Sequence, residues 1–441
     1  MKFINLILIL FVFYISWCYP KRSQINLSFI LQSSMGLMIF FPYIVSGYEY
    51  SKQIGFLSFE YSIFLNQFFV LIGILLASSR SRVLKTKDDD EHIPELKPSG
   101  NFLKFWKLLS FFGLIVGIIY IFLIPGGITG LPLIKAFQGA NNYELLIARE
   151  ETFKLMDPKW NSGPQSLIFY PLLAYRYIFY PLIVIYFWKV YKNLNKSTKF
   201  LGWLVTFMAI FLTIANGQRA PLPAFLIRVA FFYFAFKGIK RTKLIKKIPI
   251  YLFLILSVPL FITISNYADG DIGLGLNLFF KRLTFTPLQD LLDYFNAFPH
   301  NWNFLYGDTV LKPLKHLLGI DYFYIENEMC FFSNPYSIES CHSNAAYLSN
   351  LWADFGYVGI SIGSFLVSYV INLCDNIIVE KKASFLDDCF YGFLSYTIVV
   401  LAFGSVTSVL GTNGGLLCIV YFIGRYSKFS SRIFKGWYSK H

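Results

Sequence analysis

The chain has 441 residues, of which 56% are hydrophobic and only 15% are charged. Soluble domains contain about 45–50% apolar and about 25% charged residues, so this composition excludes an ordinary soluble fold. The formal net charge of +14 does not indicate nucleic-acid binding, because the Lys and Arg residues form short clusters between apolar runs instead of one basic patch. We therefore expect an all-α, polytopic integral membrane protein whose partners include the lipid bilayer and no nucleic acid.

About eleven apolar runs are candidates to cross a bilayer, since about 20 residues at helical rise match the hydrocarbon thickness. They are residues 3–19, 24–46, 58–79, 102–124, 167–188, 200–216, 220–236, 248–265, 345–373, 386–406 and 408–424. The first run lacks a strong basic n-region and a small-residue cleavage site, so we expect a retained span there and not a signal peptide. These runs predict a single transmembrane domain over residues 1–441.

The basic clusters between the runs predict the orientation, because Lys and Arg in short loops stay in the cytoplasm. When the spans alternate, the clusters at 80–87, 189–199 and 237–247 and the carboxy-terminal tail all fall on one face. We therefore expect the carboxy terminus inside and the amino terminus outside. Two long segments, 125–166 and 266–344, are then extracytoplasmic.

These two outer segments are candidates for the functional part of the chain, because loops of such length are usually functional or disordered. The first contains a predicted helix from about Asn142 to Met156 between turn signals, and a solvated connector is the alternative. In the second, apolar residues recur at helical spacing from Asn277 to Phe295. This pattern predicts a helix that lies on the membrane surface and is broken near Pro287.

An arginine follows a tight outer turn between two spans. The turn reads Asn216-Gly217-Gln218-Arg219, and the APLP sequence after it restarts a helix with proline in the first turn. A guanidinium binds phosphate oxygens bidentately and a helix amino terminus adds partial positive charge, so Arg219 is a candidate anion site. The alternative is a side chain that only reaches lipid headgroups.

Other charged residues lie where charge is costly. Arg176 and Arg228 fall within apolar runs, where an unpaired charge costs several kcal/mol, so each needs a partner or a wet cavity. Asp354, in a later run, is a candidate counter-ion, and a structural buried pair and a ligand site are equally open. Lys281 and Arg282 open the predicted surface helix as candidates for half of a pyrophosphate clamp, with lipid contact as the alternative.

The large outer segment ends in the sequence CHSNAAYLSNLWADFGYVG. His342 stands at the mouth of a span, and histidine is the side chain whose ordinary pKa suits a general base near neutral pH. A loop histidine without a chemical role is the alternative. Asn344 follows it, and Gly356, Gly359 and Gly363 recur at a spacing that lets another helix approach closely.

The sequence contains no Walker loop, GxSxG, HExxH or aspartate-rich motif, and its cysteines lack metal-ligand spacing. We therefore expect neither a cofactor nor a metal. Cys330 and Cys341 are the only cysteines within the large outer segment, where an oxidising compartment permits a disulfide between them. Two free thiols are the alternative.

The long hydrophobic chain, the NGQR turn and the motif HSNAAYLSNLWADFGYVG together resemble the Wzy-type oligosaccharide repeat-unit polymerases of bacterial O-antigen and capsule assembly. The chain is also similar to the related O-antigen ligases, with a longer spacing between Ser343 and Gly356. The resemblance implies a multi-pass glycosyltransferase of the bacterial inner membrane with its active site facing the periplasm. Its substrates would be undecaprenyl-pyrophosphate-linked oligosaccharides, and a chain-length regulator protein would be a further partner.

In such an enzyme His342 would deprotonate the attacking sugar hydroxyl, while Arg219 and Arg282 would stabilise the departing pyrophosphate. The other candidate substrate-binding residues are Lys281, Arg176, Arg228, Asn344 and Asp354. A ligase, which differs only in its acceptor, and a lipid-linked oligosaccharide flippase are the alternatives. An ion-coupled transporter would favour broken helices with charged residues at mid-membrane, and the only residues that support this alternative are Arg176, Arg228 and Asp354.

Overall fold

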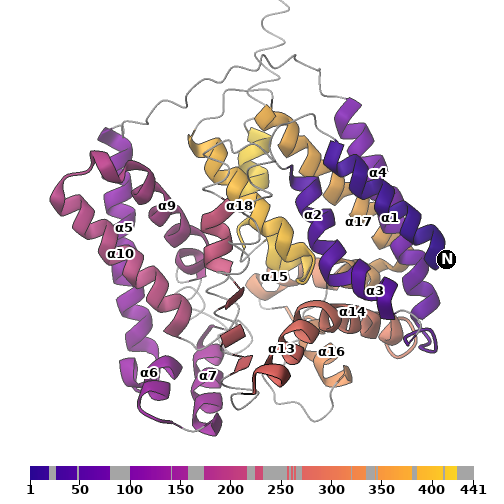
Figure 1. The fold of residues 1–441 in the computed structure, drawn as a ribbon, viewed down its shortest axis with the longest axis horizontal. Coiled ribbons are helices and arrows are strands. Elements are labelled where there is room, and N and C mark those ends of the chain that lie inside the picture. The colour runs from indigo at the N-terminus through magenta and orange to yellow at the C-terminus, as the bar shows by residue number, and fades with distance from the viewer. Residues whose placement is uncertain are drawn as a thin grey trace, which may run out of the picture. The chain divides into compact units, whose positions relative to one another are not determined.

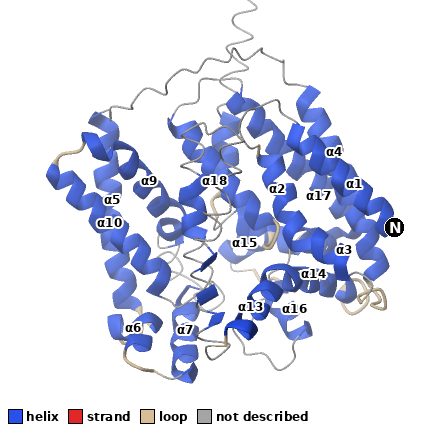
Figure 2. Ribbon diagram, in the orientation of Figure 1, coloured by secondary structure: helices blue, strands red, loops and turns tan. Residues whose placement is uncertain are grey.

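The computed structural model describes residues 1–18, 26–46, 49–79, 100–140, 142–156, 173–215, 224–231, 256–257, 260–261, 263–264, 271–318, 320–333, 343, 346–379, 385–410 and 413–424. Within these ranges every regular element is a helix (Figure 2). The predicted all-α class is therefore confirmed for the described part of the chain.

Five helices are long and apolar enough to cross a membrane: Leu27–Ser46, Phe56–Ser78, Leu103–Leu123, Lys196–Ala215 and Tyr347–Asn376. They coincide with five of the predicted runs. Three further runs correspond to shorter apolar helices, Lys2–Cys18, Phe390–Leu401 and Gly415–Gly424. The runs at 167–188, 220–236 and 248–265 lie partly or largely outside the described residues, so the count of about eleven spans stays a prediction.

The chain forms two compact units, and the single transmembrane domain stays a prediction. The first contains Met1–Asp88, Gly238–Thr242 and Phe280–His441, and the second contains the intervening chain. The helices of the first unit, labelled in Figure 1 where there is room, are α1 (Lys2–Cys18), α2 (Leu27–Met35), η1 (Gly36–Phe40), α3 (Phe41–Ser46), α4 (Phe56–Ser79), η5 (Lys281–Phe285), α14 (Thr286–Ala297), α15 (Asp308–Leu318), α16 (Ile325–Ser333), α17 (Tyr347–Val379), α18 (Phe385–Leu401) and α19 (Val406–Leu410).

Those of the second unit are α5 (Gly100–Leu123), η2 (Gly127–Gly130), α6 (Pro132–Phe137), α7 (Asn142–Met156), η3 (Tyr175–Phe179), α9 (Tyr180–Val190), η4 (Tyr191–Asn193), α10 (Lys196–Ala215) and nearly all of α13 (Ile272–Phe280). The helix predicted within the first outer segment is confirmed as α7. Here α5 packs against α9 through polar anchors: Trp106 donates its indole N–H to the carbonyl of Ile183 at 3.0 Å, and Tyr180 donates its hydroxyl to that of Gly113 at 2.6 Å.

The core of the first unit is the interface between α4 and α17, which run side by side (Figure 1). Ser368 donates its hydroxyl to the carbonyl of Val70 at 2.8 Å, and the amide of Asn376 donates to the carbonyl of Ala77 at 2.9 Å. Polar groups in an apolar interior are costly unless they are hydrogen-bonded, so these contacts fix the register of the two helices.

A sharp kink at Gly356 divides α17 into two helices. Gly356 has φ 57° and ψ −136°, a conformation that residues with a side chain rarely adopt. The first half of α17 (residues 347–355) lies close against the second half (residues 357–379). A Cβ at Gly359 would lie 2.2 Å from the carbonyl oxygen of Leu351, and one at Gly363 would lie 2.5 Å from the Leu351 side chain. The predicted close approach of a helix to these glycines is confirmed, and that helix is the chain's own preceding segment.

The helix predicted from Asn277 to Phe295 exists as continuous helical backbone through α13, η5 and α14. The prediction of a break near Pro287 is wrong. The turn η5, which is π-helical, directly precedes α14, and Pro287 occupies the first turn of α14. Such a wide turn lets the backbone continue past a residue that cannot donate an N–H.

The apolar face of α14 is covered by protein and not by a membrane surface. Leu288, Leu291, Leu292 and Phe295 are each at most 1% exposed. Phe295 stacks on Trp352 of α17, with ring centroids 4.5 Å apart. The prediction that this part of the helix lies on the lipid is therefore wrong, because amphipathic spacing alone does not distinguish lipid from a protein core.

Candidate functional site

The site residues predicted from the sequence fall into three groups. Arg219, His342 and Asn344 lie outside the described residues. Arg176 and Arg228 belong to the second unit, whereas Lys281, Arg282 and Asp354 belong to the first. Each unit is therefore described by itself.

Two buried arginines of the second unit converge on one tyrosine ring. Arg176 lies in η3, a single π-helical turn, and is 6% exposed, while Arg228 lies in a helical stretch over residues 224–231 and is 1% exposed. Their guanidinium carbons stand 5.6 Å and 5.1 Å from the centroid of the Tyr177 ring. Because π-helical turns are rare and occur frequently at functional sites, this cluster is a candidate for holding an anionic group.

Lys281 and Arg282 are exposed residues of η5, within the helical backbone that runs from α13 into α14. The prediction that they open the helix is wrong, because the helical backbone already begins at Ile272. Their assignment to a pyrophosphate clamp stays a prediction.

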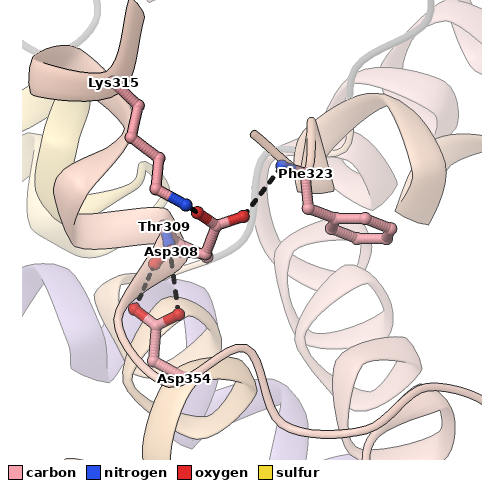
Figure 3. Close-up of polar contacts among 5 residues, drawn as sticks. All are labelled: Asp308, Thr309, Lys315, Phe323 and Asp354. Carbon is pink, nitrogen blue, oxygen red and sulfur yellow. Dashed lines mark hydrogen bonds and ion pairs between the residues drawn. The ribbon is translucent and has the colours of Figure 1, made fainter. Parts of the chain in front are cut away.

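Asp354 caps the amino terminus of α15 (Figure 3). Its carboxylate accepts the backbone N–H of Thr309 at 3.2 Å and the hydroxyl of Thr309 at 2.5 Å, and the side chain is fully buried. A carboxylate at a helix amino terminus satisfies backbone N–H groups that have no partner within the helix. These two hydrogen bonds join α17 to α15, where the sequence suggested a counter-ion for an arginine.

The kink in α17 explains why Asp354 is available for this role. Residues 357–376 alone span about 30 Å at 1.5 Å per residue, enough to cross the hydrocarbon. Asp354 precedes them, near the end of the first half of α17. The carbonyls of Ala353 and Asp354 accept the N–H groups of Leu305 at 2.9 Å and Tyr306 at 3.0 Å. The Asp354 carboxylate thus accepts a hydrogen bond from the start of α15, and the carbonyls at the end of the first half of α17 accept hydrogen bonds from the residues just before α15.

Ion pairs and a hydrogen bond stabilise α15 and join it to the segment that follows it. Lys315 pairs with Asp308, whose other carboxylate oxygen accepts the N–H of Phe323 at 2.8 Å (Figure 3). Lys312 pairs with Glu326 of α16 at 2.8 Å and stands 3.8 Å above the ring of Tyr324. These contacts order the chain between α15 and α16.

The same network reaches the residue that follows His342 in the sequence. Ser343 donates its backbone N–H to the carbonyl of Glu326 at 2.8 Å and is only 5% exposed. Tyr294 of α14 is also buried, and burial raises the pKa of its hydroxyl well above the ordinary value, while Ser349 and Ser343 beside it act in the opposite direction. The described residues of this unit thus form a fixed frame next to His342 in the chain.

A disulfide involves α16. Cys330 is disulfide-bonded, whereas Cys18, Cys374 and Cys418 are free thiols. The predicted disulfide is therefore confirmed at Cys330. The side chain of its predicted partner, Cys341, lies outside the described residues, so that pairing stays a prediction.

Asp293 of α14 is a further buried carboxylate. It is 8% exposed and accepts the amide of Gln289 at 2.8 Å and the hydroxyl of Ser333 at 2.6 Å. Burial raises the pKa of Asp293, and the two hydrogen bonds offset only part of this effect. The folded protein consequently holds this proton more tightly than the unfolded chain does.

We expect Asp293→Asn to raise the melting temperature at pH 7 by a few degrees, about 1–3 °C. A raised carboxyl pKa means that stability is full below the unfolded pKa of about 3.9 and falls as pH rises through the folded pKa, a loss that asparagine avoids. The Ser333 hydroxyl is also 3.0 Å from the carbonyl of Met329, so it can donate there and accept from the new amide. Melting curves at pH 4 and pH 7 test this, and the gain should vanish at pH 4.

Ser333→Ala is the control, because it removes a hydrogen bond from the carboxylate and should lower stability at pH 7. If Asp293→Asn melted lower than the parent protein at pH 7 but not at pH 4, the ionised carboxylate would stabilise the fold and the prediction would be wrong.

Several residues that position this frame received no role from the sequence. Asn66 of α4 accepts the hydroxyl of Tyr347 and, at 2.8 Å, that of Ser364. Asp375 accepts the N–H of Leu27 at the start of α2 and the hydroxyl of Tyr391. A polar residue in an apolar run is costly without a partner, and this signal could have identified both.

Comparison with known proteins identified no relative of this chain. No protein-family model, no curated protein and no solved structure matches it.

Proposed function

We propose that this protein is a membrane glycosyltransferase that polymerises undecaprenyl-pyrophosphate-linked oligosaccharide repeat units at the periplasmic face of the inner membrane. The observation that carries the proposal is the packing of α14 and α15 onto α17, with α16 packed against α14. A connector between spans would not need this, whereas an enzyme must hold its reacting groups on rigid elements. The motif that resembles the polymerases, HSNAAYLSNLWADFGYVG, runs through that helix.

In the proposed reaction, a hydroxyl of one lipid-linked repeat unit attacks the anomeric carbon of the growing glycan. The bond from that carbon to the pyrophosphate breaks, and the pyrophosphate keeps the electron pair while a new glycosidic bond forms. His342 accepts the hydroxyl proton, and Arg219 balances the charge that develops on the leaving group. The sugar is already activated by its lipid carrier.

The arginines around Tyr177 support a pyrophosphate-linked substrate. Two guanidinium groups at 6% and 1% exposure stand near the same tyrosine ring, and electrostatic interactions are stronger in a buried site than in water. A guanidinium fork matches pairs of phosphate oxygens, so Arg176 and Arg228 suit a dianion better than a neutral solute.

Deletion in the native strain tests the proposal, with lipopolysaccharide separated on a gel. One repeat unit per core in place of a ladder supports a polymerase. Loss of every repeat unit indicates the ligase or flippase alternative instead.

His342→Ala is expected to abolish chain extension at normal protein levels, because no base remains to accept the hydroxyl proton. The readout is the length distribution of the polymer in the complemented deletion strain. His300→Ala is a matched control, since His300 is an exposed histidine of the same outer segment and should leave the ladder unchanged. Normal polymer length in His342→Ala would assign the base role to another group.

Arg219→Lys is expected to lose most of the chain extension, at least about tenfold, although it keeps the positive charge. An ammonium group cannot supply the planar fork that binds two phosphate oxygens. The same gel measures the effect, with membrane levels of the variant checked by immunoblot. A lysine variant with a full ladder would leave Arg219 as a headgroup contact only.

A further inference from the structure

The helix α15 has an apolar edge that faces outward. Val310, Leu311 and Leu318 are 41%, 48% and 61% exposed. At 100° per residue, Leu311 and Leu318 lie about 20° apart around the helix and form one stripe. Tyr306 just before the helix is 77% exposed, and Ile320 just after it is 51% exposed. A soluble surface helix would carry polar residues at these positions.

The polar side chains of α15 that the structure describes are engaged with the protein. Thr309 binds Asp354, Lys312 pairs with Glu326, and Lys315 pairs with Asp308 two turns earlier. Among the described side chains of α15, the charged groups thus bind the protein, and Val310, Leu311 and Leu318 are exposed.

The start of α15 lies beside the kink that precedes an exposed apolar face of the candidate span. Val358, Ile362 and Leu366 of α17 are 62%, 55% and 50% exposed, and their spacing of four residues places them on one side of the helix. Phe355, at the kink, is 44% exposed, and a Cβ at Gly307 would lie 3.1 Å from its ring. The beginning of α15 therefore touches the end of that face.

We infer that α15 lies in the membrane–water interface, with Leu311 and Leu318 in bilayer lipid beside the start of the second half of α17. Lipid is the occupant that fits, because α15 begins beside an exposed apolar face of a helix long enough to cross the membrane. The exposed Tyr306 agrees, since tyrosine is enriched at membrane interfaces. The sequence pattern predicted a membrane-surface helix at residues 277–295, and we assign that position to α15, a later helix of the same segment.

Nitroxide labels on the full-length protein in phosphatidylcholine and phosphatidylglycerol vesicles test this inference. The label is attached through a genetically encoded ketone amino acid, so that the disulfide at Cys330 stays intact. One label replaces Leu311 and another replaces Leu318. Ile362 is the lipid control, and Glu328, an exposed residue of α16, is the water control. Relaxation enhancement by oxygen reports lipid, and enhancement by a soluble nickel chelate reports water.

We expect the oxygen-to-nickel ratio at both α15 positions to exceed that at Glu328 by at least about threefold and to stay below that at Ile362, as for a helix at the bilayer surface. A ratio equal to that at Glu328 would place α15 in water and overturn the inference. Low accessibility to both reagents would also overturn it, because a second copy or another protein would then cover the stripe. Neither result depends on catalytic activity, so this test is independent of the proposed reaction.

Discussion

Gly359→Ala is expected to prevent the two halves of α17 from packing, with a cost of about 3 kcal/mol or more. The new Cβ would lie 2.2 Å from the carbonyl oxygen of Leu351, and a backbone atom cannot rotate away as a flexible side chain can. The first half of the helix would have to move, together with its contacts to α15. Size-exclusion profiles in detergent and melting curves would show aggregation or a large loss of stability.

Gly36→Ala is the matched control, because Gly36 is also helical and a Cβ added there would meet no atom within 4 Å. This variant should elute and melt as the parent protein does. Should Gly359→Ala behave in the same way, the close contact between Leu351 and Gly359 would not exist in the protein.

Asp354→Ala is expected to destabilise the outer segment by about 2–4 kcal/mol, because it removes a cap and leaves buried N–H and hydroxyl donors without acceptors. Both donors belong to Thr309, at the start of α15. Limited proteolysis should cut the chain around α15 earlier than in the parent protein, and the melting temperature should fall. Activity would fall as a consequence of the disordered segment.

Thr309→Val separates capping from chemistry, since it removes only the hydroxyl and should give a smaller loss, about 1 kcal/mol. In a double-mutant cycle the two substitutions should be non-additive, because they remove the same hydrogen bond. An Asp354→Ala protein that resists protease normally yet forms no polymer would instead show that the carboxylate acts on substrate.

The helical class and the positions of five long spans could be predicted because they depend on local apolar composition. Helix α7 was also predictable, since turn residues bound it at both ends. The burial of α14 was not, because the same periodic pattern suits lipid and a protein core equally. The order of residues alone offers no means to decide which of two amphipathic stretches, α14 or α15, faces outward.

The candidate site was less predictable, because its contacts join residues far apart in the chain. Asp354 binds Thr309, 45 residues earlier, so a sequence that places an aspartate within an apolar run cannot name this partner. The kink at Gly356 was also not predictable. A glycine in an apolar run indicates either close packing or an unusual backbone, and here Gly356 has the unusual backbone while Gly359 and Gly363 pack closely. The convergence of Arg176 and Arg228 on Tyr177 likewise required the fold.

A single side-chain oxygen atom of α4 accepts hydrogen bonds from both halves of α17. The side-chain carbonyl of Asn66 receives the hydroxyl of Tyr347 from the first half and that of Ser364 from the second. Straightening or closing the kink would break at least one of these bonds and leave a buried hydroxyl unsatisfied, at about 1–3 kcal/mol. These two hydrogen bonds therefore stabilise the bend at one angle. In the polymerase that we propose, this bend would not move aside for a lengthening glycan, so room for each added repeat unit would come from movement elsewhere in the chain.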